Sequence, residues 1–398
     1  MKIALISDWF SEKMGYAENC LPKAIAALGH EVHLITSNVQ PYFDLPTYSE
    51  TYEPFIGPGT VACEVKELDG YTLHRLQYAR LWRRLRIKGL VRKLLEIRPQ
   101  IVQTFDAFSL TTLEAALARS LSGHKLFLES HIHASVFPAS GSARKPWKWR
   151  VYSSTLGRAT SRLSEKCYPV STDAAQIAIE FLGIQESKVV VCSLGVDTDL
   201  FRPADSAAAQ QARGQLRQRL GLAESDVVCI YTGRFSPDKN PLCLAQAIDR
   251  LAAQGQPFRG LFVGSGTRAE IEAIRACEGC VVHPFVPTRD LPPFYWAADI
   301  GVWPRQESTS QLDAAACGLP IVLSHRVQVR ERIDGNGLMY QENDALSLAE
   351  TLKTLADPSL RRRLGLAGAQ KMQEYYSWNR IARQRVWDYS DELQSRGR

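Results

Sequence analysis

The sequence contains no run of about 18 consecutive apolar residues, the length that a helix needs to cross a bilayer. Its first residues, MKIALISDWF, lead directly into a strand-like pattern and show neither the apolar region nor the cleavage site of a secretory signal. Low-complexity stretches and short-period repeats are also absent. We therefore expect a folded, cytoplasmic protein without a membrane-spanning segment.

The usual signatures of zinc and dinucleotide binding are missing as well. The nine cysteines are scattered, and only Cys277 and Cys280 form a Cys-x-x-Cys pair, with no second pair and no closely spaced histidines. We expect reduced thiols and no metal cofactor. No GxGxxG follows the first strand pattern of either half, which argues against a nicotinamide dehydrogenase. No nucleic-acid-binding module is recognisable either.

What the sequence does contain is an alternation of short β-branched runs with amphipathic helical stretches, repeated in two halves. In the first half the expected strands are residues 3–7, 31–36, 101–105 and 125–129, with a helix at 17–28. In the second half they are residues 227–232, 260–263, 280–283, 300–303 and 321–323, with a helix at 242–253 and a helical end from about residue 346. This pattern predicts α/β structure, with parallel sheets covered by helices on both faces.

The chain of 398 residues is too long for one ordinary core and suits two domains. We expect Rossmann-like domains at residues 1–198 and 199–377, with a helix at 378–398 that packs back on the first. The segment GVDTDLFRP at 195–203 and the polar, Ala- and Gln-rich stretch after it are interpreted as a linker. Because ligands of parallel sheets bind beyond the carboxyl ends of the strands, we expect the site in a cleft between the two sheets.

The segment WPRQESTSQLDAAACGLPIV, residues 303–322, has the clearest chemical content. A strand ends at Trp303, a loop carries Glu307, and a helix with Asp313 in its first turns stops near Gly318. Three hydroxyl residues suited to helix capping lie between them: Ser308, Thr309 and Ser310. Such a helix N-terminus binds anions and would suit a diphosphate, although an ordinary capped helix gives the same pattern.

A second polar loop, TGRFSPDKNP at 232–241, directly follows the first strand of the second half. Arg234 and Lys239 could neutralise two phosphate charges there, the first as a planar fork and the second as a point charge. The alternative is a solvated turn, because Pro, Asp and Asn favour turns.

Taken in order, these segments resemble the retaining glycosyltransferases of family 4, which have the GT-B fold. The resemblance extends over nearly the whole chain. Its motifs are GHEV at 29–32, VSTD at 170–173, GVDTDLFRP at 195–203, GRFSPDK at 233–239, VGSGT at 263–267, AADIGVWP at 297–304, ACGLPIV at 316–322 and DGNGL at 334–338.

The resemblance implies roles for residues of the second half. Arg234 and Lys239 would hold the donor diphosphate, and Asp313 would take the place of the family's second acid, which binds the ribose hydroxyls. Counting back without a gap places Arg305 at the position of the first acid, which contacts the transferred sugar. Counting forward from the strand places Glu307 there, and we prefer Glu307. The acids are then closer together than in the family, and the second is Asp rather than Glu.

In the first half the resemblance implies two further positions. Gly15 remains where the family has two glycines after the first strand, and it would let the backbone approach the donor phosphate. His131, rather than His133, fits the position of a histidine near the donor sugar. From the residues alone, Gly15 is equally compatible with a plain turn and His131 with a structural histidine.

The positive charge of the chain is concentrated in one segment. Residues 80–98 hold eight cations and one acid, so that this segment has a charge of +7 while the whole chain has +6. Apolar residues recur between the cations, and RKPWKWR at 144–150 adds aromatic residues. We interpret residues 80–98 as a basic amphipathic helix that docks on an anionic membrane to reach a lipid-linked acceptor. A solvated basic face is the alternative.

The expected function is retaining transfer of a sugar from a UDP- or GDP-sugar to a hydroxyl acceptor, without a metal, in the synthesis of a glycan, glycolipid or surface polysaccharide. The resemblance leaves two alternatives open, a GT-B sugar-nucleotide epimerase and a nucleotide-sugar-binding protein without turnover.

Overall fold

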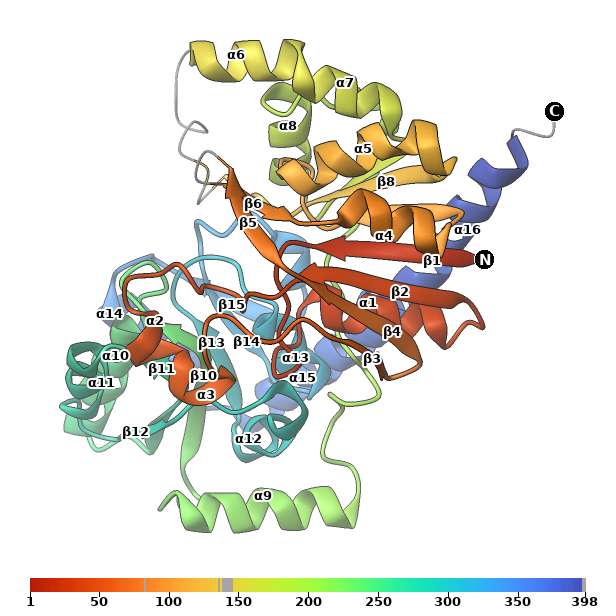
Figure 1. Ribbon diagram of the computed structural model, residues 1–398. Coiled ribbons are helices and arrows are strands. Elements are labelled where there is room, and N and C mark those ends of the chain that lie inside the picture. Colours follow the sequence, from red (N-terminus) through yellow and green to blue (C-terminus); the bar gives the residue numbers. More distant parts are fainter. Residues whose placement is uncertain (82–83, 135–136, 138–145, 396–398) are drawn as a thin grey trace. The chain divides into compact units, whose positions relative to one another are not determined.

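The computed structural model describes residues 1–81, 84–134, 137 and 146–395 and divides the chain into two compact units (Figure 1). The first unit comprises Met1–Phe43, Pro58–Leu194 and Trp378–Arg398, and the second comprises Asp44–Gly57 and Gly195–Ser377. This division differs in two ways from the expected domains at 1–198 and 199–377. The chain passes into the second unit at residue 195, and residues 44–57 of the first half also belong to the second unit.

The first unit is built on a seven-stranded sheet with strand order β3-β4-β2-β1-β7-β8-β9. Its strands are β1 (Lys2–Ser7), β2 (Glu31–Ser37), β3 (Val65–Leu68), β4 (Tyr71–Leu76), β7 (Ile101–Thr104), β8 (Lys125–Ser130) and β9 (Lys166–Pro169). Every pairing in this sheet is parallel except that of β3 with β4. The central strands are buried on both sides, which explains why they were recognisable as continuous apolar runs.

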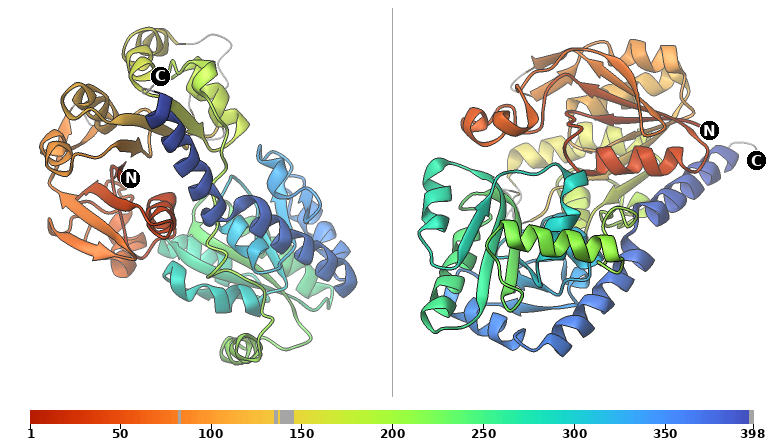
Figure 2. Two further views of the ribbon diagram at one scale, coloured as in Figure 1. Left: turned by 90° about the vertical axis from the view of Figure 1, so that its right-hand side faces the viewer. Right: turned by 90° about the horizontal axis from the view of Figure 1, so that it is seen from below.

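Helices cover this sheet and enclose two apolar clusters. They are α1 (Ala17–Ala26), α4 (Leu90–Ile97), α5 (Leu110–Ser122), α6 (Trp147–Ser154), α7 (Leu156–Leu163), α8 (Thr172–Glu180) and the C-terminal α16 (Trp378–Gln394). Figure 2 shows α16, in dark blue, beside α1, in red. Trp378, Ile381 and Tyr389 of α16 share a buried cluster with Leu21 of α1, so the end of the chain completes the core of the first unit.

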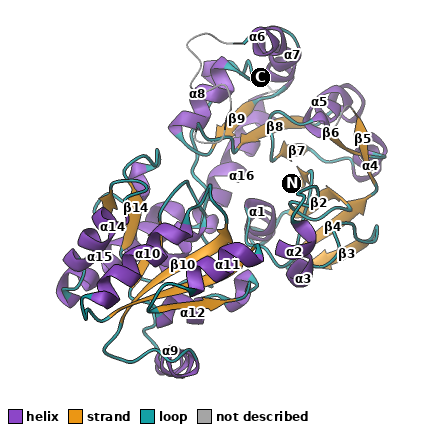
Figure 3. Cartoon of the chain, turned by 90° about the vertical axis from the view of Figure 1, so that its left-hand side faces the viewer, coloured by secondary structure: helices purple, strands orange, loops and turns teal. Residues whose placement is uncertain are grey.

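The second unit has a six-stranded parallel sheet with strand order β12-β11-β10-β13-β14-β15. Its strands are β10 (Val227–Phe235), β11 (Phe258–Gly266), β12 (Cys280–His283), β13 (Ile300–Trp303), β14 (Ile321–Ser324) and β15 (Gly337–Tyr340). Its helices are α2 (Tyr48–Thr51), α3 (Glu53–Ile56), α9 (Ala207–Arg219), α10 (Pro241–Ala253), α11 (Arg268–Arg275), α12 (Pro292–Ala297), α13 (Ser310–Ala316), α14 (Ala345–Thr354) and α15 (Pro358–Lys371). Figure 3 shows α10, α14 and α15 beside these strands.

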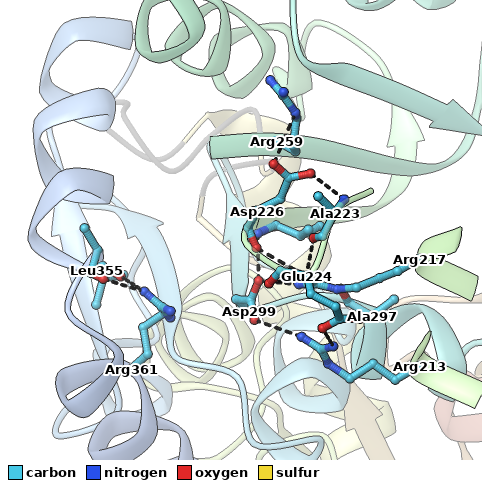
Figure 4. A network of polar contacts seen from close by, with 12 residues as sticks. Arg213, Arg217, Ala223, Glu224, Asp226, Arg259, Ala297, Asp299, Leu355 and Arg361 are labelled. Atoms are coloured by element: carbon cyan, nitrogen blue, oxygen red, sulfur yellow. Dashed lines mark hydrogen bonds and ion pairs between the residues drawn. The ribbon is translucent and has the colours of Figure 1, made fainter. Parts of the chain in front are cut away.

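The stretch after residue 203, which we expected to be linker, instead forms helix α9 within the second unit. Figure 4 shows how α9 is held. Arg217, with a side chain only 1% exposed, donates to the main-chain oxygens of Ala297 (2.8 Å) and Ala223 (2.9 Å) and to the Asp299 carboxylate (2.6 Å). Asp299 in turn accepts from the amide of Val228 (2.8 Å), so α9 is tied to the start of β10.

Residues 80–98 do not form the single basic helix that we expected. Tyr78–Leu81 (β5) and Arg84–Ile87 (β6) pair as an antiparallel hairpin, and only Leu90–Ile97 is helical. Leu90 and Leu94 are buried in the core. The apolar face of α4 is therefore buried in the first unit, and the cations of this segment lie mainly on its surface. Trp82 and Arg83 lie outside the described residues, as do Arg144 and Lys145.

Candidate active site

The carboxyl ends of β10 and β11 approach each other closely because they carry glycines. Gly233 has φ +144° and Gly264 has φ +158°, values that favour glycine. A Cβ atom at Gly264 would lie 1.8 Å from the main-chain oxygen of Gly233, a contact that no side chain tolerates. Because neither residue has a side chain, the two strand ends lie close together where the predicted phosphate-binding loop begins.

Arg234 lies at the end of β10, and its side chain is half-buried. Its Nη2 atom pairs with Oδ2 of Asp238 at 2.9 Å, within the same loop. The amides of Lys239 and Asn240 both donate to the oxygen of Ser236, at 3.0 and 2.8 Å. The loop is therefore a hydrogen-bonded turn that holds its guanidinium by an ion pair.

Lys239 connects this loop to the second predicted segment. Its Nζ atom donates to the main-chain oxygen of Glu307 at 2.9 Å. Burial lowers the pKa of Lys239, while the acidic neighbours Asp238 and Glu307 act in the opposite direction. The structure thus brings together two loops that follow different strands, β10 and β13.

The loop after β13 is held in an unusual conformation. Gln306 has φ +60°, and its main-chain oxygen accepts from the buried side chain of Gln311 at 3.3 Å. The next residue, Glu307, accepts a hydrogen bond from the amide of Gln328 at Oε1 (3.2 Å). A non-glycine residue in this region costs free energy and is common at functional sites. The surrounding contacts fix the position of the Glu307 carboxylate.

Arg305, the rival for the first acid position, has other contacts. Its Nη1 atom lies 3.4 Å from the oxygen of Pro237, and its Nε atom lies 3.8 Å from Oε1 of Glu342. Glu342 is partly buried and also accepts from the Ser324 hydroxyl at 2.7 Å. Nothing in the sequence pattern pointed to Glu342, which follows β15.

Helix α13 begins differently from the expected three-hydroxyl cap. Thr309 has helical angles (φ −66°, ψ −30°) and makes no capping hydrogen bond, and Ser308 instead accepts from the amide of Ser310 at 3.3 Å. Ser310 contacts the buried hydroxyl of Tyr295, which lies 2.8 Å from the Thr232 hydroxyl. The hydroxyls of Ser308 and Ser310 therefore have separate partners, and it is Ser308 that accepts from an amide at the start of the helix.

Asp313 projects from α13 and is half-buried. Burial raises the pKa of this carboxyl well above its ordinary value, and the nearby charge of Asp197 raises it further. Within the part of the chain that the structure describes, its carboxylate has no hydrogen bond or ion pair. Its oxygens are thus available to a ligand hydroxyl, which is what the ribose role requires.

In the first unit, His131 follows β8 and pairs with Glu129, the last residue but one of that strand. The distance from Nε2 of His131 to Oε2 of Glu129 is 2.7 Å. His133 has a different partner, Asp173, at 3.4 Å, and lies 3.3 Å from the Ser171 hydroxyl. Gly15 precedes Tyr16, the N-cap residue of α1, whose amide donates to Asn19 (3.2 Å).

Two further acids act on His131, and the sequence pattern singled out neither of them. They are Glu18 in the first turn of α1 and Asp106 after β7. Burial raises the pKa of Glu18 to about 7 and also raises that of Asp106. Burial alone would lower the pKa of His131, but the bond to Glu129 and these negative charges raise it overall. These neighbours therefore favour the protonated form of His131.

Two further structural features are absent from the described residues. No three His, Cys, Asp or Glu side chains there are grouped so that they could hold a metal ion. No helix in those same ranges is both long and apolar enough to cross a membrane.

Two family models match the chain. The model described as Glycosyltransferase Family 4 matches residues 21–200, and the one described as Glycosyl transferases group 1 matches residues 226–357. The chain is also 30% identical over 241 residues to the D-inositol 3-phosphate glycosyltransferase of Geodermatophilus obscurus, a match that covers 55% of this chain and 51% of the relative. A spore coat protein, SA of Bacillus subtilis, is 26% identical over 215 residues, which cover 49% of this chain and 57% of that protein. The chain thus covers about half the length of these curated relatives.

Solved structures match over the full length. Anabaena HepE in complex with UDP has a TM-score of 0.69 at 16% identity, covering 98% of this chain and 100% of that one. Sucrose-phosphate synthase from Thermosynechococcus elongatus has a TM-score of 0.69 at 18% identity, and the match covers 99% of this chain and 100% of the synthase chain. With its two parallel-sheet units, the protein has the GT-B fold. The family models, which follow one another along the chain, show in addition that it is similar to the glycosyltransferases of family 4 and group 1.

Proposed function

We propose that the protein transfers a sugar from a nucleotide diphosphate sugar to a hydroxyl acceptor. The observation that carries this proposal is the hydrogen bond from Lys239 to the main-chain oxygen of Glu307 (2.9 Å). It joins the loop with the predicted diphosphate cations to the loop with the predicted sugar-contacting acid. A sugar bonded to a diphosphate needs both contacts side by side.

The reaction would depend on stabilising negative charge on the leaving diphosphate. Arg234 and Lys239 supply two positive charges at one strand end, and fixed charges of this kind stabilise a developing anion without reorganisation. We propose that these cations take the role that a metal has in other phosphate sites, so that the reaction needs no metal cofactor.

The donor and the stereochemistry are proposed from the comparisons. HepE has been crystallised with UDP and with UDP-glucose, and it shares the fold of this chain. We propose a UDP- or GDP-sugar as donor, with Asp313 on the ribose and with Glu307 and His131 at the sugar. Retention of anomeric configuration follows from the family resemblance.

A thermal-shift screen tests the donor proposal, since a ligand that binds only the folded state raises the melting temperature. UDP, GDP and their sugars should raise it, while the nucleoside monophosphates should do so less and inorganic phosphate not at all. Product analysis then separates the alternatives. An epimerase would change the donor sugar without any acceptor, and a pure binding protein would bind the donor without consuming it.

We further propose that the first unit docks on an anionic membrane, which would place the acceptor at the lipid surface in glycolipid or surface polysaccharide synthesis. The support is one continuous surface. Arg84 of the β5–β6 hairpin lies over the ring of Phe108 (3.9 Å), and Trp149 of α6 contacts the same ring (4.9 Å). The hairpin and α6 therefore meet around Phe108.

This surface combines exposed cations with exposed apolar side chains. Trp147 and Val151 of α6 are 78% and 52% exposed, and Lys148 and Arg150 lie between them. In the hairpin segment, Arg86 pairs with Glu114, but among the described residues no acid pairs with Arg84 or Lys88. Cations beside an exposed tryptophan match the chemistry of an anionic bilayer interface.

A further inference from the structure

The C-terminal helix contributes a charged side chain to the His131 site. Arg385 of α16 is buried, and its Nη2 atom lies 3.1 Å from Oε1 of Glu129, 256 positions earlier in the sequence. The other carboxylate oxygen of Glu129 takes the bond from His131 (2.7 Å). One buried carboxylate therefore connects the C-terminal helix to the histidine.

Helix α16 also supports this carboxylate in a second way. Gln103 of β7 donates from Nε2 to Oε1 of Glu129 at 3.0 Å. Its own oxygen accepts from the hydroxyl of Tyr389, one turn after Arg385 on α16. The Arg385 guanidinium lies 3.2 Å from the ring centre of Tyr168, which fixes its plane. Both donors to Oε1 of Glu129 are thus positioned by α16.

The charges explain what this arrangement does. Burial alone would raise the pKa of Glu129, but the bond from His131 and the charge of Arg385 hold it below its usual value. An ionised Glu129 accepts the Nε2–H of His131, and this leaves Nδ1 as the ring nitrogen available to a ligand. Glu18 and Asp106 also face the ring and favour its protonated form.

We propose that Arg385 and Glu129 are positioning residues for His131, so that the C-terminal helix is part of the active site. This inference rests on the proposed role of His131 at the donor sugar. A small displacement of a catalytic group lowers the reaction rate strongly, because the group then no longer has the geometry that the reaction needs. The two residues act on turnover through the orientation and protonation of His131, without touching the nucleotide.

The first test does not depend on activity. The pKa of His131 can be measured from its ring signals in NMR spectra, which a His131→Gln variant assigns. This pKa should be lower in Glu129→Gln than in the wild type, because the neutral Gln side chain lacks the negative charge that stabilises the imidazolium. An unchanged His131 pKa in a folded Glu129→Gln variant would overturn the proposal.

The second test is kinetic and uses a control variant that removes a different contact of the same helix. Arg385→Met should lower kcat on the order of tenfold or more, with an unchanged nucleotide Kd. Arg385→Lys, which keeps the charge, should recover part of the loss. Lys166→Met removes the ion pair of Lys166 with Asp388 of α16 (2.8 Å), whereas Asp388 keeps its bond from the Tyr168 hydroxyl (2.8 Å), so kcat should be unchanged.

The outcomes separate this proposal from the proposed function. Equal loss of kcat in Arg385→Met and Lys166→Met would show that α16 acts only through folding, and it would overturn the positioning role. Should Arg385→Met not fold, Arg385→Lys and Glu129→Gln carry the test. If His131→Ala is fully active although Glu129→Gln lowers the pKa of His131, His131 has no role in catalysis. The contacts between Arg385, Glu129 and His131 would still stand.

Discussion

The Nζ atom of Lys239 lies 2.9 Å from the main-chain oxygen of Glu307, although 68 positions separate the two residues in the sequence. The contact exists because β10 and β13 are neighbours in a parallel sheet, so that the loops at their carboxyl ends meet. It fixes the backbone of the acid loop by a cation, while the Glu307 carboxylate is held separately by the amide of Gln328.

Replacing Glu307 by Gln should lower turnover on the order of 100-fold and leave nucleotide affinity unchanged. The charge is lost, but the side chain can still accept from the Gln328 amide, so the loop should keep its shape. Steady-state kinetics and calorimetric titration with UDP or GDP measure the two effects. Arg305→Ala is the matched comparison. An active Glu307→Gln together with an inactive Arg305→Ala would assign the first acid position to residue 305 instead.

Replacing Asp313 by Ala should weaken both the free nucleotide diphosphate and the sugar donor, since the ribose is common to both. Because burial raises the pKa of Asp313 and so favours the neutral carboxyl, the lost hydrogen bond should be worth about 0.5–1.5 kcal/mol, the value for uncharged groups. Titration of the wild type with ribose and 2′-deoxyribose nucleotides provides the control. Equal affinities for the two sugars, together with an unchanged affinity in Asp313→Ala, would rule out the ribose contact.

Sedimentation with vesicles checks the membrane proposal. Vesicles with anionic lipid should recover the wild type at low salt and release it at high salt, because exposed charges are screened over about 8–10 Å at physiological ionic strength. Arg84→Glu with Lys88→Glu should abolish recovery. Arg362→Glu with Arg363→Glu, an equal charge change on exposed residues of α15, should not. Equal recovery on neutral and anionic vesicles would leave a soluble acceptor as the better interpretation.

The buried Arg217 of α9 should be essential for the stability of the second unit. Arg217→Met removes a donor from the Asp299 carboxylate and from four main-chain oxygens, and breaking a buried pair of this kind costs about 3–5 kcal/mol. Chemical denaturation should show this loss. Arg213→Met, on the same helix but with a more exposed side chain, should cost less than about 1 kcal/mol. Similar losses in both variants would mean that the network of Figure 4 is not the reason for the stability.

The sequence was most informative where a strand is buried on both faces. The strand expected at 300–303 agrees at both ends with β13, which is fully buried, because apolar runs bounded by polar residues mark such strands. The partly buried edge strand β12 also agrees at both ends with the strand expected at 280–283. It was misleading at α9, where the polar composition suggested a linker, and at residues 80–98, where the spacing of apolar residues suggested one helix. In both cases tertiary contacts decided the outcome, those of Arg217 for the first and the hairpin pairing for the second.

The candidate site shows the same limit. Arg234, Lys239, Glu307 and Asp313 could be named from motifs because each lies in a polar loop or short helix directly after a strand. The contacts of Glu129 with Arg385 could not, because 256 positions separate them and no local pattern marks a buried arginine in a C-terminal helix. Residues 44–57 likewise belong to the second unit through contacts that no local signal announces, such as Glu50 with the amide of Arg268 (2.6 Å).

The most direct test of the account is calorimetric titration of UDP and GDP into the wild type, Arg234→Ala and Lys239→Ala. At least one nucleotide should bind the wild type, and each substitution should weaken it by about 1.5–3 kcal/mol, the value of a hydrogen bond to a charged group. Arg259→Ala, which removes a partly exposed arginine that pairs with Asp226 at 3.6 Å, should bind like the wild type. Undiminished affinity in both folded variants, Arg234→Ala and Lys239→Ala, would contradict the placement of the donor diphosphate at the end of β10.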